Sequence, residues 1–341
     1  MPPTGLILSN LGSPASPDRG AVAAYLRHFL TDRRAIDIGW FPRQLLVRGI
    51  IAPFRSPRSA RAYRKVWTPE GSPLVVHTRA LATKVGGILG PEWRVAAGMR
   101  TGSPDLETAL DGLLAEGCRR ILILPLYPQY ASATVGSTLE EAWKLASRKE
   151  VVPEIVPISP FHDHPGFLEA VADRIRPVLE QAPSARLVLS FHGLPERQIR
   201  KADPVGKCLT AGCCESGEGI HRGCYKAQCS ATAAGLARVL GLPAERWTIS
   251  FQSRLGRIPW IGPSTAQTLA DLAAKGERDV VVATPSFVAD CLETLEEIGM
   301  GLAERFEASG GRLHLVPCLN SGEDWARTVA GMALSYLPPP R

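Results

Sequence analysis

Residues 186–195 read RLVLSFHGLP, a short apolar run that ends in a histidine followed by a glycine and a proline. Buried parallel strands have this form, with branched apolar residues bounded by Gly or Pro. Near the N-terminus, residues 5–14 read GLILSNLGSP and repeat the same plan. The two segments indicate a weak internal repeat, with one copy in each half of the chain.

Similar apolar runs follow each of these segments, separated by longer amphipathic stretches that suit helices. The pattern predicts an α/β chain of two similar Rossmann-like domains, residues 1–165 and 166–341, each with a four-stranded parallel sheet flanked by helices. The expected strands are Gly5 to Leu11, Trp93 to Met99, Arg120 to Leu126, Glu154 to Ile158, Arg186 to Phe191, Trp247 to Phe251, Asp279 to Ala283 and Arg312 to Val316.

The carboxyl ends of the strands are where open α/β sheets bind ligands, so we expect an active-site cleft between the two domains. No Gly-rich phosphate-binding motif follows any expected strand. Neither NAD nor ATP is therefore expected.

The composition is that of an ordinary globular protein, with 341 residues, 45% hydrophobic and 21% charged. The absence of a basic leader and of a run of about 20 apolar residues predicts a cytoplasmic protein without a membrane anchor. The formal charge of +6 suits acidic lipids, acidic substrates or nucleic acid, and its wide spread selects none of them.

Residues 33–64 lie outside the repeat and mix apolar residues with spaced arginines, as in GWFPRQLLVRGIIAPFR at 39–55. This pattern fits an amphipathic lip that faces a membrane or admits a substrate. It fits equally a helix packed on a sheet with its arginines in water. The sequence leaves both interpretations open.

Three carboxylates, Asp290, Glu293 and Glu297, have the spacing i, i+3 and i+7, which places them on one face of a helix. Such a stripe is by itself more typical of a surface that complements the helix dipole. If the repeat holds, however, this helix begins beside the loop that carries His192. A lone histidine is more often structural than catalytic, and no Gly-x-Ser-x-Gly motif supports a Ser-His hydrolase.

Several motifs, in one order along the chain, resemble those of the ferrochelatase family. They are LSNLGSP (8–14), YRK (63–65) with GSP (71–73), LPLYPQY (124–130) with Gly136-Ser137, SFHGLP (190–195), QSRLG (252–256) with PWIGP (259–263), and DCLETL (290–295). The resemblance runs from about Gly5 to about Ser321. It implies an enzyme that inserts Fe(II) into protoporphyrin IX to form protohaem, the last step of haem biosynthesis.

The resemblance also implies roles for the polar residues. His192 matches the active-site histidine and Glu293 its partner across the porphyrin, both near the substrate iron, while Asp290 and Glu297 line the path of the ion or of protons. Metallation removes two pyrrole protons and strips water from a cation, tasks that suit an imidazole and carboxylates. A coproporphyrin ferrochelatase, a cobalt chelatase and a tetrapyrrole-binding carrier without activity are the alternatives.

The porphyrin contacts implied by the resemblance are apolar and aromatic walls for the macrocycle and basic residues for its propionates. Without the resemblance, core packing or surface charge would explain each of them. They are Leu11, Met99, Tyr127, Trp260 and Phe287 for the walls, Arg64, Lys65 and Arg100 for the propionates, and Ser253 as a further contact.

One position departs from the family pattern. Many members carry Asp-His-x-Glu where this chain has Asp290-Cys291-Leu292-Glu293. We interpret the histidine as dispensable and Cys291 as a small buried apolar residue, so Cys291→Ala should change little.

Five of the eight cysteines crowd into residues 208–229, in an insert at about 205–229 that short ferrochelatases lack. In a chain of this size the crowding indicates metal binding rather than disulfides. We favour a 2Fe-2S cluster over zinc or free thiols, although His221 keeps a Cys3His zinc site open. The expected ligands are four of the five, including one of the adjacent pair: Cys208, Cys213, Cys214, Cys224 and Cys229.

A cluster in this insert would be structural or sensory, because metallation needs no redox step. The expected partners are porphyrin and ferrous iron, with peripheral membrane contact at most and no nucleic acid.

Overall fold

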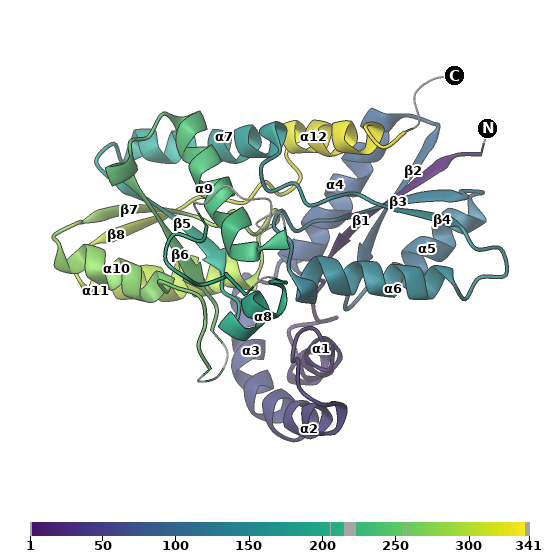
Figure 1. Cartoon of the computed structure of the whole chain (residues 1–341), viewed down its shortest axis with the longest axis horizontal. Helices are drawn as coiled ribbons and strands as arrows, with labels where there is room; N and C mark the ends of the chain where they lie inside the picture. Colours follow the sequence, from purple (N-terminus) through teal and green to yellow (C-terminus); the bar gives the residue numbers. More distant parts are fainter. Residues whose placement is uncertain (1, 205, 215–222, 255, 257, 338–341) are drawn as a thin grey trace. The chain divides into compact units, whose positions relative to one another are not determined.

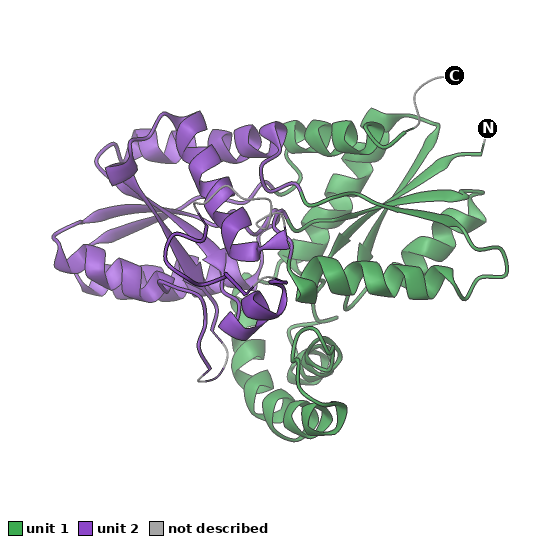
Figure 2. Cartoon of the chain, in the orientation of Figure 1, with its two compact units in different colours: residues 1–127, 131–160, 320–341 green, residues 128–130, 161–319 purple. Residues whose placement is uncertain are grey.

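The computed structural model describes the chain except residues 1, 205, 215–222, 255, 257 and 338–341. The described residues form two compact units, coloured separately in Figure 2. Unit 1 comprises residues 1–127, 131–160 and 320–341, and unit 2 comprises residues 128–130 and 161–319.

Unit 1 is built on a parallel sheet with the order β2-β1-β3-β4. Helices α5 and α6 cover one face, packing on Ile7, Ile121 and Ile123, while α4 and α12 lie on the other (Figure 1). The elements are β1 (Thr4–Asn10), α1 (Arg19–Leu30), α2 (Trp40–Leu45), π-helix η1 (Leu46–Ile51), α3 (Ala52–Val66), α4 (Pro73–Leu89), β2 (Trp93–Met99), α5 (Leu106–Ala115), β3 (Arg120–Pro125), π-helix η2 (Ser132–Gly136), α6 (Ser137–Ala146), β4 (Glu154–Pro157) and α12 (Glu323–Leu334).

Unit 2 repeats this plan, with the parallel order β6-β5-β7-β8. Helices α7 and α9 pack together, and α10, η5 and α11 enclose a core around Val188, Val280 and Val282 (Figure 1). The elements are α7 (Pro165–Gln181), β5 (Arg186–His192), α8 (Glu196–Lys201), α9 (Tyr225–Leu240), the short η4 (Ala244–Arg246), β6 (Trp247–Gln252), α10 (Thr265–Ala274), β7 (Asp279–Ala283), π-helix η5 (Glu293–Leu302), α11 (Ala303–Ala308) and β8 (Arg312–Leu315).

The predicted fold class, two four-stranded parallel sheets flanked by helices, is confirmed in the described residues. The strand order is the same in the two units, so β5 occupies in unit 2 the central place that β1 has in unit 1. The strands that the sequence predicted agree with the observed ones to within one residue at either end.

The C-terminal segment needs a correction, because residues 320–341 group with unit 1 and not with the second half of the chain. Helix α12 packs on α4, and its Trp325 is fully buried. Three hydrogen bonds hold the segment in unit 1. Lys84 Nζ donates to the Ser321 carbonyl at 2.5 Å, Arg120 Nη2 to the Tyr336 carbonyl at 3.1 Å, and the Ser159 amide to the Tyr336 hydroxyl at 2.9 Å. The local sequence of α12 does not reveal which sheet its apolar face will cover.

Helices α2 and α3, joined by η1, form an arm that extends away from the sheet of unit 1 (Figure 1). The arm packs on α1 through a small core of Leu30, Ile36 and Val47, so it is not a helix laid on the sheet. Among the described residues, no helix is both long enough and apolar enough to cross a membrane.

Candidate active site

Polar side chains gather at the carboxyl ends of the central strands of unit 2. His192 is the last residue of β5, Gln252 the last of β6, and Ser286 follows β7 closely. The π-helix η5 begins at Glu293, a short distance along the chain after β7. Because parallel strands end at one edge of the sheet, these side chains converge there, as expected for an α/β site.

The imidazole of His192 has a defined tautomer. Its Nδ1 lies 2.6 Å from the carbonyl oxygen of Gly193, and a carbonyl can only accept a hydrogen bond. Nδ1 therefore carries the proton of the neutral ring, which leaves a lone pair on Nε2. The Phe287 ring lies beside the imidazole, with 6.1 Å between the ring centroids. Nε2 of His192 can thus act as a base, on an imidazole that is oriented by the Gly193 carbonyl and lies beside the Phe287 ring.

Gly193 allows the close turn after β5. A Cβ atom at this position would lie 2.9 Å from the backbone oxygen of Gln252 and 3.3 Å from the Trp260 ring. The Gly193 amide instead donates to that same Gln252 oxygen at 2.7 Å. The turn that carries His192 is therefore fixed directly against β6.

Ser253 holds the carboxylate of Glu297. Its amide and its hydroxyl donate to the two carboxylate oxygens at 2.9 and 2.5 Å. Ser253 has a φ of 64°, in the left-handed region that a residue with a side chain seldom adopts. Ser253 thus binds Glu297 while its own backbone is strained. Strained backbone of this kind is typical of functional sites.

Burial raises the pKa of Glu297 above its usual 4.5, and the neighbouring Glu293 charge raises it further, whereas the Ser253 hydrogen bonds and His192 oppose the rise. The ionised form of this carboxyl is thus disfavoured in the folded chain. Glu297, Glu293 and His192 act on one another electrostatically, as members of one site do.

The raised pKa of Glu297 predicts a pH effect on stability. The native state holds this proton more tightly than the unfolded state, so stability falls as pH rises from the unfolded value of 4.5 through the higher folded value. Glu297→Gln should therefore raise the melting temperature by roughly 2–4 °C at about pH 8 and much less at about pH 4. Calorimetry across this range checks it, with the exposed Glu304→Gln as control; equal melting temperatures of Glu297→Gln and wild type at both pH values would contradict the assignment.

Glu293 lies at the first turn of η5, where the Gln252 side-chain amide donates to its backbone oxygen at 3.2 Å. Gln252 in turn accepts a hydrogen bond from Ser190 at 2.7 Å inside the sheet. The start of the π-helix is therefore tied to the central strands.

Asp290 does not belong to the helical face that the sequence predicted. It precedes η5 and is 7% exposed, and its Oδ1 accepts hydrogen bonds from the Thr294 hydroxyl at 3.2 Å and the Cys318 amide at 3.4 Å. The prediction assumed one α-helix from Asp290 to Glu297, whereas the helix starts at Glu293 with π winding. Cys291 is 4% exposed, in agreement with its interpretation as a buried thiol.

Two residues near His192 were missed by the sequence analysis. The Tyr225 hydroxyl donates to the His192 carbonyl oxygen at 2.7 Å, and Ser286 accepts from the His192 amide at 3.4 Å. The position of Ser286 after β7 was a usable signal, because strand ends carry the site. No sequence feature pointed to Tyr225, because it lies in the cysteine-rich insert and does not follow a predicted strand.

The described cysteines of the insert lie in close pairs. The Sγ atoms of Cys208 and Cys224 are 3.8 Å apart, and those of Cys213 and Cys214 are 3.9 Å apart. Cys229, in α9, is fully buried. Among the described residues no three His, Cys, Asp or Glu side chains are placed to hold a single metal ion, and His221 lies outside these residues.

The environment of two cysteines of the insert, Cys208 and Cys214, disfavours their thiolate forms. Burial, followed by the neighbouring Cys224, raises the pKa of Cys208 to about 12, and burial, followed by Cys213, raises the pKa of Cys214 to about 11. Metal binding to these residues would release protons, since thiolates are the ligands.

The expected porphyrin contacts of unit 1 lie at the ends of its central strands. Met99 is fully buried at the end of β2, and Leu11 directly follows β1. Arg100 forms an ion pair of 2.9 Å with Asp32, whereas the Tyr127 hydroxyl is buried beside Thr138. The basic residues at the end of α3 are exposed: Arg64 and Lys65.

Trp260, expected as a porphyrin contact, lies in unit 2 beside the His192 turn. It is half-buried, and its backbone pairs with Pro195. With Phe287 it places aromatic surface on two sides of the turn.

Comparisons with known proteins identify the family to which the chain belongs. The sequence model described as Ferrochelatase matches residues 3–337. The ferrochelatase of Legionella pneumophila (strain Philadelphia 1) is 43% identical over 326 residues, which is 95% of this chain and 97% of the relative. That of Pseudomonas syringae pv. tomato is 45% identical over 330 residues, 95% of each chain.

Among solved structures, SirB from Bacillus subtilis with Fe3+ is similar in fold, with a TM-score of 0.54 at 13% identity over 98% of this chain and 95% of that one. A likeness at this identity supports the fold alone. The family model and the curated relatives span nearly the whole sequence, and on these grounds the chain belongs to the ferrochelatase family.

Proposed function

We propose that this chain inserts ferrous iron into protoporphyrin IX to form protohaem, with the carboxyl edge of unit 2 as its metallation site. The observation that carries the proposal is the oriented tautomer of His192, whose Nδ1 is occupied by the Gly193 carbonyl. The free Nε2 can accept a pyrrole proton, and family membership supplies the reaction class.

The carboxylates have the complementary task in this proposal. Hydrated Fe(II) must lose water before it enters the macrocycle, and carboxylate oxygens can replace that water. Glu293 and Glu297 are neighbours in η5, and Glu297 is fixed by two hydrogen bonds from Ser253. The raised pKa of Glu297 also suits it to hold a proton that has left the ring. Asp290 is left out of the path because, unlike the partly exposed Glu297, it is buried and bonded to the Thr294 hydroxyl and the Cys318 amide.

Porphyrin contacts in unit 1 are proposed at Leu11, Met99 and Tyr127. Burial raises the pKa of the Tyr127 hydroxyl, which lies beside Thr138, so that it stays a hydrogen-bond donor. Arg64 and Lys65 are exposed and suit propionates, whereas Arg100 already neutralises Asp32 and is a weaker choice.

The test is anaerobic incubation of the purified protein with Fe(II) and protoporphyrin IX, followed by haem absorbance, with Glu293→Gln alongside. Haem formation by the wild type, and a large loss in the variant, are expected. Porphyrin binding without haem formation would favour a tetrapyrrole carrier. Faster turnover with coproporphyrin, or with cobalt and a corrin precursor, would move the assignment to those substrates.

For the insert we propose a 2Fe-2S cluster held by Cys208 and Cys224 on one iron and by Cys213 and Cys214 on the other. Two thiolates on one tetrahedral metal with bonds of about 2.3 Å lie about 3.8 Å apart. The observed separations of 3.8 and 3.9 Å fit that value in each pair. A single zinc would need at least three of these thiolates around one ion, and no such group of three occurs among the described residues.

This assignment uses both adjacent cysteines and leaves Cys229 out, in contrast to the expectation from sequence. A bound cluster would supply cross-links between α9 and the residues before it. Metallation transfers no electrons to or from the protein, so we assign the cluster a structural or sensory task.

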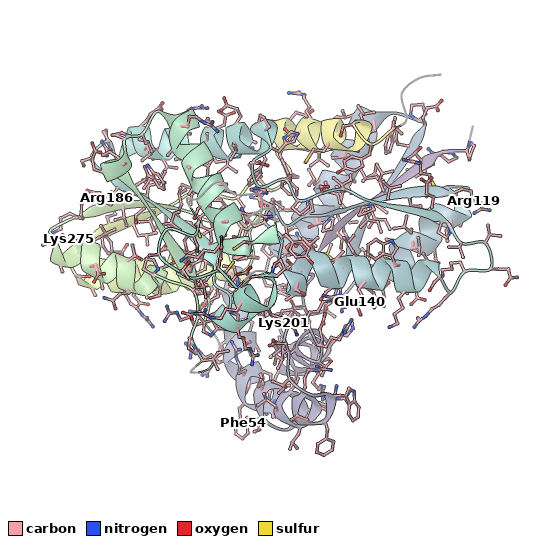
Figure 3. All side chains as sticks on the ribbon, viewed as in Figure 1. Phe54, Arg119, Glu140, Arg186, Lys201 and Lys275 are labelled. Carbon is pink, nitrogen blue, oxygen red and sulfur yellow. The ribbon has the colours of Figure 1, made fainter. Side chains whose placement is uncertain are left out.

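The arm of unit 1 is proposed to bind the surface of an anionic membrane. Five large apolar side chains are strongly exposed on it, from 54% to 78%: Trp40, Phe41, Leu45, Ile50 and Phe54. Figure 3 shows Phe54 at the end of the arm, directed away from the sheet. Residues 33–64 contain eight arginines and one aspartate, so acidic lipids complement the charge.

Loss of the apolar tip should abolish membrane binding. In the double variant Trp40→Asp and Phe54→Asp, binding to vesicles of phosphatidylglycerol and phosphatidylcholine should fall by roughly 10²- to 10⁴-fold, because two buried aromatic side chains contribute about 1.5–3 kcal/mol each. Vesicle co-sedimentation measures it. Trp143→Asp, which changes an exposed Trp on α6, should bind as the wild type does. Equal binding by all three proteins would contradict the proposal.

A further inference from the structure

A closed ring of hydrogen bonds surrounds the backbone of His192. The His192 amide donates to Ser286 Oγ at 3.4 Å, and the Tyr225 hydroxyl donates to the His192 carbonyl at 2.7 Å. The two hydroxyls of Ser286 and Tyr225 are 3.2 Å apart. Both peptide groups of the histidine are therefore held by the same pair of side chains.

The proton count fixes the direction of every bond in this ring. Tyr225 has one hydroxyl proton, and the carbonyl of His192 takes it. The contact between the two hydroxyls must then be a donation from Ser286 to the phenol oxygen, while Ser286 accepts from the His192 amide. Each donor of the ring therefore meets an acceptor, and the Cys229 thiol is a further hydrogen-bond neighbour of the Tyr225 hydroxyl.

Tyr225 is also the first residue of α9 and directly follows Cys224. Cys224 caps this helix and lies 3.8 Å from Cys208, sulfur to sulfur, and Cys229 follows Tyr225 by one helical turn. The side chain of Tyr225 is 7% exposed, so its hydroxyl has little freedom to move without the start of α9. Tyr225 therefore connects the cysteine-containing residues 208–224 to the turn that carries His192.

We propose that Tyr225 and Ser286 are positioning residues for His192, and that Tyr225 transmits the state of the cysteine segment to the imidazole. When Cys208 and Cys224 are cross-linked by metal, the start of α9 is fixed and the ring holds the His192 turn in place. When the thiols are free, Tyr225 loosens and Nε2 is less well aligned. This inference rests on the proposed role of His192 as proton acceptor.

The alternative is that Tyr225 only contributes to packing. Tyr225→Phe distinguishes the positioning role from the packing role, because it keeps the aromatic ring and removes the hydroxyl alone. We expect kcat to fall about tenfold, the kinetic equivalent of one lost hydrogen bond of about 1.4 kcal/mol, with KM for porphyrin unchanged. The 15N resonances of the His192 imidazole should shift as well. Ser286→Ala should have the same signature.

Matched controls remove the same groups elsewhere. Tyr336→Phe deletes a phenol hydroxyl in unit 1 that bonds to the Ser159 amide. Ser230→Ala deletes a hydroxyl on α9 itself, which bonds to the Lys226 carbonyl at 3.2 Å. Both should keep the wild-type kcat and the wild-type imidazole resonances.

Coupling to the cysteines is tested by a double-mutant cycle with Cys224→Ser. If Tyr225 transmits the effect, Cys224→Ser and Tyr225→Phe each lower kcat about tenfold, and the double variant is no worse than either. Independent effects would multiply to about a hundredfold and would overturn the transmission step. A Tyr225→Phe variant with wild-type kcat and imidazole resonances would overturn the positioning role. Failure of the proposed function is distinct, because the wild type itself would then form no haem.

Discussion

Replacement of His192 by alanine should lower the rate of haem formation by about 10²- to 10⁴-fold, the contribution of a positioned general base. The reason is geometric. The Gly193 carbonyl fixes the proton on Nδ1 and leaves Nε2 free to accept, and the ring of Tyr225 and Ser286 fixes the backbone from which the imidazole extends. No other described histidine ends a strand at this edge of unit 2.

The measurement is haem formation under anaerobic conditions, with porphyrin fluorescence quenching to monitor substrate binding separately. Quenching should be retained in His192→Ala, since the imidazole is needed for proton transfer more than for affinity. His28→Ala, at an exposed position on α1, should be fully active. A His192→Ala variant that forms haem within a factor of about ten of the wild-type rate would remove general-base catalysis from the mechanism.

With the cluster proposed above, Cys224→Ser should lose the bound iron and sulfide and should destabilise unit 2. Cys224 belongs to the pair with Cys208, and it is also the N-cap residue that directly precedes α9. Because metal binding to a site absent from the unfolded chain adds to folding free energy, loss of one ligand lowers the melting temperature as well as the metal content. We expect a loss of roughly 2–8 °C, the effect of about 1–2 kcal/mol in a domain of this size.

Iron and sulfide analysis, the visible spectrum and calorimetry read out this prediction. Cys208→Ser should behave as Cys224→Ser does, whereas Cys229→Ala should keep the cluster because its thiol is outside both pairs. Cys118→Ala, a buried thiol of unit 1, serves as the control for loss of a cysteine. A colourless wild type with one zinc per chain would replace the cluster with a zinc site, and loss of iron in Cys229→Ala would refute the pairing.

The strands could be predicted from sequence because their signal is local. Runs such as Leu187 to Phe191 are apolar on both faces, since helices cover both faces of the sheet, and a Gly or Pro ends each run. The similarity of SNLGSP (9–14) to SFHGLP (190–195) then placed Leu11 and His192 at equivalent strand ends. Resemblance of the motifs added the reaction class, which periodicity alone does not carry.

The acidic stripe shows where this local reasoning failed. Spacing alone made Asp290, Glu293 and Glu297 one face of an α-helix, but the winding of η5 and its starting point depend on contacts with Gln252, Ser253 and Cys318. Those residues come from other strands and loops of unit 2. Asp290 consequently bonds inward while Glu297 is held in the site.

By itself, then, the sequence determined the eight strands, their division into two sheets and the identity of His192 and Glu293 as candidates. Tertiary structure alone decided that α12 returns to unit 1, that Ser253 holds Glu297, and that Tyr225 ties the cysteine segment to His192. The physical reason is the distance along the sequence between the residues that interact. Strand formation follows from neighbouring side chains, whereas a hydrogen bond between Tyr225 and His192 joins residues 33 positions apart and exists only once the sheet has brought them together.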